Sequence, residues 1–251
     1  MQFLAKHIIL FFYKIINTIS IWLSATFKVG YQVILPYATY APWLHDNAFL
    51  AIYKIVKKNS LVNIYQCYEL WQLVAETQYL NGAIIEIGTW RGASLIIMAK
   101  QAALLGKQAN NQTILYGCDT FNGVVKATKN DKYYKGGEHK NTSLAYVNNL
   151  AKLYNLHNII LLKGIFPDET GGEIAGKKFR LCHIDVDTYL SAKDVFEYIW
   201  PFIVLGGVVV FNDYGFPNTN GITTFVNQQR GQKGKMVLHN LNGNGLIVKT
   251  E

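Results

Sequence analysis

The stretch A-I-I-E-I-G-T-W-R-G-A-S, residues 83–94, decides the fold of this chain. Apolar residues flank Glu86, glycines at 88 and 92 bracket a turn, and an apolar run follows over 95–105. A short β-branched run, a glycine turn and a resumed helical period indicate a strand, a tight turn and a helix. In an α/β sheet this is the first βα unit, and ligands bind beyond the carboxyl end of its strand. We therefore expect the functional residues to follow strand ends and to face one crevice.

The same alternation of strands and helices continues to the end of the chain. Further strands are predicted at 113–118, 158–163, 180–186 and 207–211, and helices at 143–154, 189–203 and 222–229. Apolar segments at 235–239 and 245–249 flank the turn Asn242-Gly243-Asn244-Gly245, which predicts an antiparallel hairpin. The fold class is therefore α/β: a Rossmann-like, doubly wound, seven-stranded and mostly parallel sheet with a C-terminal antiparallel hairpin and an N-terminal helical extension.

Three regions are predicted along the chain. Residues 1–30 form an apolar or amphipathic helix, residues 31–80 a helical connector or cap, and residues 81–251 the α/β domain. Pro36 and Pro42 break the connector, and apolar spacing over 61–77 indicates a helix before the first strand. The Lys-, Gly- and Tyr-rich segment 124–141 is predicted to be a mobile loop beside the crevice.

The composition excludes some classes of protein. The chain is 50% apolar and 16% charged, which argues against disorder. Its net charge is +8, but the lysines are scattered and form no patch interleaved with aromatics, so nucleic acid is not the expected partner. An anionic membrane surface or an anionic substrate fits the charge better. Cys67, Cys118 and Cys182 have no CxxC spacing and are odd in number. Cys118 and Cys182 lie in predicted buried strands, which favours small core residues and a reducing, cytoplasmic compartment.

Residues 8–27 are long enough to span a bilayer, but polar residues interrupt them. The polar residues near one helical face are Lys14, Asn17, Ser24 and Lys28. This pattern favours an amphipathic helix in peripheral contact with a membrane. The alternative is a helix that packs on the domain or on a second subunit, and an exposed apolar N-terminus favours a homo-oligomer over a free monomer. No Ala-x-Ala-like cleavage site follows, which argues against a signal peptide.

The turn after the first strand is unsuited to phosphate. A dinucleotide site needs three glycines, whereas Trp90 fills this turn and Glu86 places a carboxylate near it. The carboxylate suits a cationic cofactor, so S-adenosylmethionine, which has a sulfonium and no phosphate, is favoured over NAD. Asp119 ends the second strand, where a carboxylate accepts hydrogen bonds from ribose hydroxyls, and Phe121 would wall the nucleoside. The alternative for Asp119 is a helix cap or a surface turn.

Acidic residues follow the fourth and fifth strands. Asp185 and Asp187 are two apart and point the same way while the strand persists. Asn212 and Asp213 follow the neighbouring strand. Adjacent carboxylates repel unless a cation or proton lies between them, and a set of oxygen ligands selects Mg²⁺, Mn²⁺ or Ca²⁺ over zinc. The alternative is independent turn and cap roles for these residues.

Four motifs in order resemble a known family. E-I-G-T-W-R-G-A-S, C-D-T-F-N-G, I-D-V-D-T-Y-L-S and G-G-V-V-V-F-N-D-Y-G, within residues 60–229, are similar to the macrocin O-methyltransferase (TylF/MycF-like) family. The resemblance implies an enzyme that depends on S-adenosylmethionine and a divalent metal, and that methylates sugar hydroxyls of natural products. One departure is Asn212-Asp213, where the family commonly has two aspartates.

The resemblance also assigns roles to residues. The methionine end of the cofactor would lie against the turn at 86–94, the ribose on Asp119 and the adenine beside the 164–166 turn. The predicted cofactor-binding set is Glu86, Gly88, Thr89, Arg91, Gly92, Ser94, Asp119, Thr120, Phe121, Gly164 and Ile165. The predicted metal ligands are Asp185, Asn212 and Asp213.

The expected reaction is methyl transfer to one of two vicinal hydroxyls of a small-molecule acceptor, most simply a sugar, held and acidified by Mg²⁺. Asp187 is the first candidate for the base and His139 the second, while His183 reads as a hydrogen-bonded core residue. The loop at 124–141 would close as a lid. Two alternatives remain open: a D-x-D metal-dependent glycosyltransferase, and a non-catalytic, membrane-associated binding module.

Overall fold

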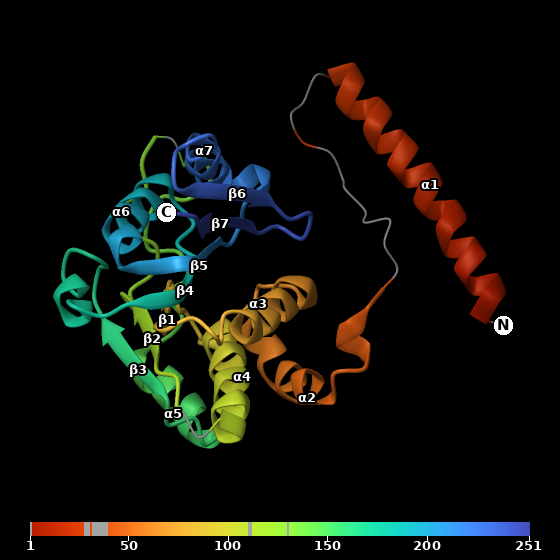
Figure 1. The fold of residues 1–251 in the computed structure, drawn as a ribbon. Helices are drawn as coiled ribbons and strands as arrows, with labels where there is room; N and C mark the ends of the chain where they lie inside the picture. The colour runs from red at the N-terminus through yellow and green to blue at the C-terminus, as the bar shows by residue number, and fades with distance from the viewer. Residues whose placement is uncertain (1, 28–30, 32–39, 110–111, 130) are drawn as a thin grey trace. The chain divides into compact units, whose positions relative to one another are not determined.

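The structure is a computed structural model, and it describes residues 2–27, 31, 40–109, 112–129 and 131–251 (Figure 1). The chain divides into two compact units, residues 1–41 and 42–251. In the first unit, α1 (Gln2–Phe27) is the helix predicted near the N-terminus. In the part of the chain that the structure describes, no helix has both the length and the apolar character needed to cross a membrane. Lys28, Pro36 and most of the predicted connector before residue 40 lie outside the described residues.

The second unit is built around a seven-stranded sheet (Figure 1). Its five parallel strands lie in the order β3-β2-β1-β4-β5 and comprise β1 (Ala83–Ile87), β2 (Leu115–Asp119), β3 (Ile159–Lys163), β4 (Phe179–Ile184) and β5 (Ile203–Phe211). The C-terminal hairpin adds β7 (Gly245–Lys249), antiparallel to β5, and β6 (Lys235–His239) beside it. The predicted fold class is confirmed. The strand order reverses between β1 and β4, which is where such sheets bind ligands.

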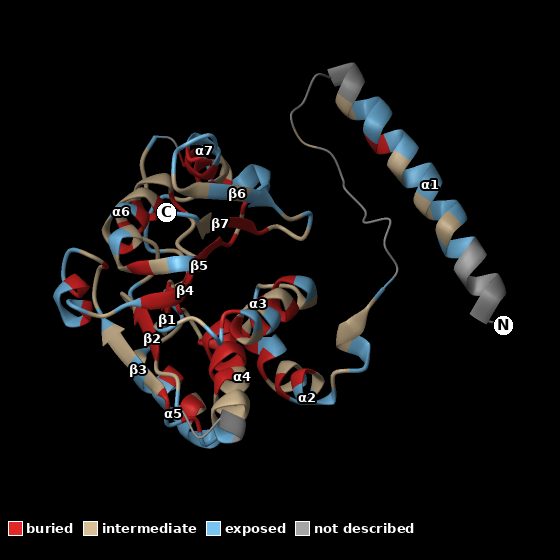
Figure 2. Ribbon diagram, viewed as in Figure 1, coloured by how far each residue is buried: buried red, intermediate tan, exposed pale blue. Residues whose placement is uncertain are grey.

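Helices cover both faces of this sheet (Figure 1). One apolar cluster contains residues of α2 (Asn47–Val56), α3 (Ile64–Glu76), α4 (Ala93–Ala109) and α5 (Leu144–Leu153), and the other those of α6 (Tyr189–Ile199) and α7 (Asn220–Gln228). Alternation along the strands separates them: Ile84 and Leu181 face the first cluster, and Ile85 and Cys182 the second. Figure 2 shows the buried residues gathered in the central strands and in α4.

Several element boundaries differ from the predicted ones for local reasons. Helix α3 begins at Ile64, three residues later than expected, because the Asn63 side chain caps it. Helix α6 ends at Ile199 because Pro201 lies in the 3₁₀ turn that follows it. Strand β5 begins at Ile203, earlier than expected, and its register with β4 shifts before Leu181.

The segment 124–141, predicted to be mobile, is tied to α6 in the structure. Lys126 lies 2.8 Å from Asp168 and 2.6 Å from Asp194, an α6 residue. The Val125 carbonyl accepts hydrogen bonds from two hydroxyls in the N-terminal turn of α6. These contacts fix Val125 and Lys126 to α6 and to Asp168.

Asp131 gives α6 the cap that its own N-cap residue lacks. The residue is 4% exposed, and its carboxylate accepts hydrogen bonds from the N–H of Tyr189 and from Thr128, each at 2.9 Å. Asp131→Ala is expected to lower the free energy of unfolding by about 2 kcal/mol, because a cap is lost and partly buried N–H groups are left unpaired. Urea denaturation measures this change. Asp131→Asn keeps one acceptor oxygen for the Tyr189 N–H but sets its NH₂ group against the Thr128 N–H, so it should lose part of the same free energy. An unchanged free energy of unfolding in Asp131→Ala would contradict the capping role.

Candidate active site

A cavity of about 410 Å³ lies at the carboxyl ends of the parallel strands. Each of the five strands contributes residues that follow its last position, so the predicted common crevice is present. The predicted site residues that line it are Gly88, Thr89, Ser94, Asp119, Thr120, His139, Gly164, Asp185, Asp187, Asn212 and Asp213. The structure does not bring five predicted cofactor contacts to the cavity wall: Glu86, Arg91, Gly92, Phe121 and Ile165.

The turn after β1 is shaped by Gly88. Its φ is +94°, and an added Cβ would lie 1.7 Å from the carbonyl oxygen of Asp185. Only glycine fits there, because the ends of β1 and β4 approach so closely. The Gly88 N–H also donates to the Cys118 carbonyl at 2.8 Å, which joins β2 to the same point. The turn therefore offers bare backbone to whatever occupies the cavity.

Asp119 is held at the end of β2 by two backbone hydrogen bonds. The N–H groups of Trp90 and Phe121 donate to its two carboxylate oxygens, each at 2.6 Å. Burial raises the pKa of Asp119, although these two N–H groups act in the opposite direction. Each oxygen keeps a lone pair for a further donor, so the carboxylate is positioned to bind hydroxyl groups in the cavity.

Four of the predicted contacts that miss the cavity wall support it instead. Arg91 donates from Nε to the Asn141 carbonyl at 3.1 Å. Gly92 allows close packing on α5, because a Cβ there would lie 2.8 Å from a Val147 methyl. Phe121 is buried in the apolar cluster of α3 and α4, and the Ile165 N–H donates to a glutamate side chain.

The Glu86 carboxylate faces the core rather than the cavity. Glu86 and His183 are register partners on β1 and β4, both fully buried, and His183 Nδ1 lies 2.8 Å from Glu86 Oε1. Alternation along β1 places Glu86 on the α3 and α4 side of the sheet, with Ile84. The direct contact expected between Glu86 and a cationic cofactor is therefore absent from this arrangement, and His183 is a hydrogen-bonded core residue.

Three carboxylates converge beyond β4 and β5. One ligand atom from each of Asp185, Asp187 and Asp213 lies within 4.8 Å of the others. Burial raises the pKa of Asp185 and of Asp187, and the charges of Asp213 and Asp187 raise that of Asp185 further. Burial and Asp187 raise the pKa of Asp213 to about 7. Such a cluster is unfavourable unless protons or a cation neutralise it.

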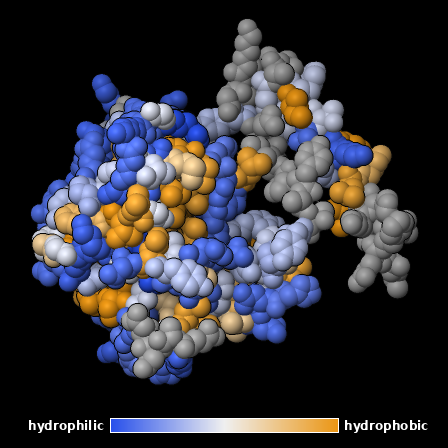
Figure 3. Space-filling model, viewed as in Figure 1, coloured by the Kyte–Doolittle hydropathy of each residue, from blue (hydrophilic) through white to orange (hydrophobic). Residues whose placement is uncertain are grey.

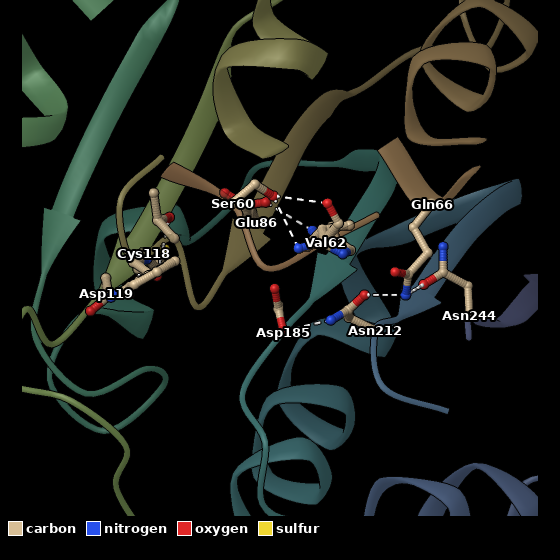
Figure 4. Close-up of polar contacts among 12 residues, drawn as sticks. Ser60, Val62, Gln66, Glu86, Cys118, Asp119, Asp185, Asn212 and Asn244 are labelled. Atoms are coloured by element: carbon tan, nitrogen blue, oxygen red, sulfur yellow. Dashed lines mark hydrogen bonds and ion pairs between the residues drawn. The ribbon is translucent and has the colours of Figure 1, made fainter. Parts of the chain in front are cut away.

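The backbone at this cluster is strained in a way typical of functional sites. Asp187 has φ +63° and Asp213 has φ +64°, both in the left-handed region that disfavours aspartate less than bulkier residues. Asn212 connects the two strands, because its Nδ2 donates to Asp185 Oδ1 at 3.0 Å (Figure 4).

Tyr134 is a site residue that the sequence reasoning missed. Its hydroxyl donates to the Asp187 carboxylate, and burial raises the pKa of Tyr134. The predicted second base, His139, lies beside it, with ring centroids 6.0 Å from Tyr134 and 5.6 Å from Trp90. Tyr134 lies in the same segment, 124–141, as His139, and the predicted position of that segment beside the crevice is the signal that could have suggested it.

Comparison with known proteins identifies the family. The profile described as "Macrocin-O-methyltransferase (TylF)" matches residues 46–242. The chain belongs to this family. The resemblance noted from the motifs is thereby confirmed, and α1 lies outside the matched residues.

Two curated relatives have names that specify sugar methylation. The chain is 24% identical over 162 residues to the 8-demethyl-8-(2,3-dimethoxy-alpha-L-rhamnosyl)-tetracenomycin-C 4'-O-methyltransferase of Streptomyces olivaceus, which covers 61% of this chain and 59% of the relative. It is 26% identical over 147 residues to the Mycinamicin III 3''-O-methyltransferase of Micromonospora griseorubida, covering 54% of this chain and 56% of the relative. The chain thus spans less than two thirds of each relative.

Solved structures share the fold. The O-methyltransferase NovP superposes with a TM-score of 0.64 at 20% identity, covering 76% of this chain and 82% of NovP. The calicheamicin methyltransferase CalS11 has a TM-score of 0.61 at 18% identity, covering 84% of this chain and 94% of CalS11. At this level of identity, the likeness supports the fold alone.

Proposed function

We propose that this protein is an S-adenosylmethionine-dependent O-methyltransferase that methylates a sugar hydroxyl with the help of a divalent cation. The observation that carries the proposal is one cavity lined both by the Gly88 turn with Asp119 and by the three-aspartate cluster, in a member of the macrocin O-methyltransferase family. The first part suits a nucleoside and the second a hard cation.

The residues at the cofactor end fit S-adenosylmethionine better than a nucleotide diphosphate. Gly88 leaves space for close approach of the ligand, and Asp119 has free lone pairs for the ribose hydroxyls. No lysine or arginine is among the described residues that line the cavity, so no basic side chain there would help to hold a pyrophosphate. When bound, S-adenosylmethionine supplies a methyl group on a positively charged sulfur.

The acidic cluster fits a divalent cation. Asp185, Asp187 and Asp213 offer buried oxygen donors only, which is the set that Mg²⁺ or Mn²⁺ accepts. When bound, the cation makes an acceptor hydroxyl more acidic and holds it in place. The chain's own part is to keep three carboxylates together at the end of the cavity.

Asp187 has two carboxylate oxygens, and we propose that the one not turned to the cation takes the hydroxyl proton. It lines the cavity, and the Tyr134 hydroxyl donates to its carboxylate and orients it. His139 is the alternative, since it lines the same wall. The N-terminal part of segment 124–141 is anchored, so we propose that the part bearing Tyr134 and His139 covers the acceptor and excludes water.

The acceptor that the cavity suits best is a neutral sugar with vicinal hydroxyls. Four aspartates line the cavity wall, and the described residues of that wall include no lysine or arginine. Even with one divalent cation bound, this wall would disfavour an acceptor that carries a diphosphate. The solved structure of CalS11 is described as that of a TDP-rhamnose 3'-O-methyltransferase, and the two curated relatives are named for glycosylated products. The negative charge of this cavity favours a glycosylated product over a sugar that carries a nucleotide diphosphate.

Calorimetry with the full-length protein and Mg²⁺ tests the proposed cofactor. S-adenosylhomocysteine is expected to bind with a dissociation constant in the micromolar range, about −8 kcal/mol, and uridine diphosphate glucose not to bind. Binding of the nucleotide sugar alone would contradict the proposal and favour a metal-dependent glycosyltransferase. Saturable cofactor binding without methyl transfer to any diol would favour the non-catalytic module.

We also propose that α1 contacts an anionic lipid surface from the cytoplasmic side. The 3.6-residue period gathers nine apolar residues on one side of the helix: Ile8, Ile9, Phe11, Phe12, Ile15, Ile16, Ile19, Trp22 and Leu23. Each is between 40% and 67% exposed, and Figure 3 shows several of the described α1 side chains as apolar surface. Residues 1–45 contain three lysines and no aspartate or glutamate, which complements anionic headgroups. The three cysteines are free and buried, which suits a reducing compartment.

Co-sedimentation with phosphatidylglycerol-containing vesicles tests this contact. Phe12→Gln combined with Ile19→Gln should weaken partitioning at least about 10-fold, because two apolar side chains no longer enter the interface. Asn17→Gln on the polar side is the matched control and should partition like the wild type. Unchanged partitioning of the double variant would contradict the proposal. A lower molar mass of that variant in light scattering would show instead that α1 joins subunits of a homo-oligomer.

A further inference from the structure

We infer that Asn212 is a hydrogen-bond donor that positions Asp185, and that the start of helix α3 imposes this role on it. The inference rests on the proposed cation role of the three aspartates. The resemblance to the family predicts Asn212 as an oxygen ligand, whereas its oxygen accepts from Gln66 and its NH₂ group faces Asp185. A chain of side-chain hydrogen bonds leads from the α3 cap through Gln66 to Asn212 and Asp185. Figure 4 shows the bonds from Gln66 to Asn212 and from Asn212 to Asp185.

The direction of the path is set by the backbone at the start of α3. The first N–H groups of a helix have no partner within the helix and require an outside acceptor. Asn63 provides it, since its Oδ1 accepts from the N–H of Tyr65 at 2.9 Å and of Gln66 at 3.0 Å. Its other end, Nδ2, must then act as a donor, and it donates to Gln66 Oε1 at 2.7 Å.

The Gln66 side chain links the α3 cap to Asn212 at the cavity wall, and its amide can be oriented in one way only. Its oxygen is occupied by the Asn63 side chain, so its Nε2 faces the other way. From there it donates to Asn212 Oδ1 at 2.8 Å and to Asn244 Oδ1 at 3.1 Å. Gln66 is 3% exposed, so both donors of its amide are used within the protein.

Asn212 has only one orientation that satisfies both neighbours. With Oδ1 on Gln66, its Nδ2 faces Asp185 Oδ1 at 3.0 Å. Reversing the amide would set two NH₂ groups against each other at Gln66 and would set its oxygen against the Asp185 carboxylate. Asn212 is 7% exposed, so water could not relieve either conflict without cost.

A second set of hydrogen bonds, from the Glu69 carboxylate through Asn244, fixes the Gln66 amide in the same orientation. Glu69 on α3 accepts hydrogen bonds from the side-chain amides of Asn240, Asn242 and Asn244, which lie at and after the end of β6. A carboxylate accepts only, so Asn244 must turn its Nδ2 to Glu69 and its oxygen to Gln66. The Gln66 NH₂ group therefore meets an oxygen on both sides.

Because Asn212 is neutral and donates, it adds no negative charge to the aspartate cluster. A neutral donor occupies one oxygen of Asp185, and the carboxylates left to face a cation belong to Asp185, Asp187 and Asp213. Asn212→Asp would replace the N–H that faces Asp185 with an oxygen. In the metal-free protein two buried carboxylates would then repel each other, and a cation would gain a fourth carboxylate residue.

Mn²⁺ titration followed by electron paramagnetic resonance, on full-length protein saturated with S-adenosylhomocysteine, tests this role. Asn212→Ala is expected to change Mn²⁺ affinity by no more than about threefold, whereas Asp213→Asn should lower it at least about 30-fold. Asn212→Asp should raise Mn²⁺ affinity about tenfold and lower the melting temperature of the metal-free protein. A loss in Asn212→Ala equal to that in Asp213→Asn would overturn the inference. Cofactor affinity reports in each case that the variant is folded.

A second experiment decides the amide orientation without any cation. In metal-free protein labelled with ¹⁵N-asparagine, the Asn212 side-chain resonance is assigned by its loss in Asn212→Ala. Asp185→Ala should shift one of its amide protons upfield and speed its exchange with water, while Asp187→Ala, the matched control, should shift it less. If Asp185→Ala left the chemical shift and the exchange rate of the Asn212 side-chain amide protons unchanged, the inference would be overturned. If the wild type bound no Mn²⁺ at all, the proposed cation role would fail, and this experiment would still judge the orientation.

Discussion

Alanine in place of Asp119 is expected to weaken S-adenosylhomocysteine binding at least about 100-fold, since two hydrogen bonds between ribose hydroxyls and a carboxylate, of about 1.5–3 kcal/mol each, are lost. The carboxylate lines the cavity and is held by the N–H groups of Trp90 and Phe121 at 2.6 Å. It is thus positioned before the ligand arrives, which limits the entropy lost on binding. Isothermal titration calorimetry measures the change.

A control must separate the ribose contact from the support that Asp119 gives to the turn at Trp90. The Thr142 hydroxyl donates to the Trp90 carbonyl at 2.5 Å and does not line the cavity. Thr142→Val removes this link with little change of shape and should weaken cofactor binding no more than about fivefold, the value of one neutral hydrogen bond. If Thr142→Val weakened binding as much as Asp119→Ala, the carboxylate would act by holding the turn, and its ribose role would be wrong.

Asp185→Asn is expected to reduce Mg²⁺-dependent turnover about 1,000-fold, because loss of a charged ligand removes several kcal/mol of stabilisation by the cation. The affinity for S-adenosylhomocysteine should change by no more than about threefold, since Asp185 lies at the acceptor end rather than beside Asp119. Activity remaining in the variant should be insensitive to EDTA. Methyl transfer followed by mass spectrometry gives the rates, and calorimetry gives the affinity.

Asp194→Asn is the matched control for charge. Asp194 pairs with Lys126 at 2.6 Å, its side chain is 29% exposed, and it does not line the cavity. The same change of charge there should leave turnover within about threefold of the wild type, because Asp194 lies outside the cavity wall and Asp168 still pairs with Lys126 at 2.8 Å. Turnover of Asp185→Asn that stayed near the wild-type rate, with or without EDTA, would remove the basis for a cation at this cluster.

Much of the candidate site could be predicted from the sequence, because its residues follow the ends of strands and those ends can be located from the apolar pattern. Asp119, Asp185 and Asp213 each end or follow a buried strand, and the carboxyl ends of parallel strands meet at one edge of the sheet. Their convergence on one cavity was therefore predictable without knowing any loop. Gly88 was predictable for the same reason, since it alone permits the close approach of β1 and β4.

The direction in which side chains point was harder to predict. Glu86 lies near the same strand end, but alternation turns it toward His183 and α3. The pairing of Glu86 with His183 could have been inferred from the sequence. Each stands two residues before a residue of the close turn, Gly88 or Asp185, and so at the same level of neighbouring strands. Gln66 precedes β1 on a helix that could not be placed over the cavity from its spacing alone, so its contact with Asn212 needed the three-dimensional structure.

Transfer of a labelled methyl group to a neutral glycoside is the decisive test of cation-assisted sugar methylation by this protein. The full-length protein is incubated with methyl-labelled S-adenosylmethionine and a panel of rhamnosides with free vicinal hydroxyls, with Mg²⁺ or with EDTA. We expect a singly O-methylated sugar in the presence of Mg²⁺, its loss with EDTA, and its return when Mg²⁺ is restored. Equal methylation in EDTA, or labelled product from nucleotide-diphosphate sugars and none from neutral glycosides, would contradict it.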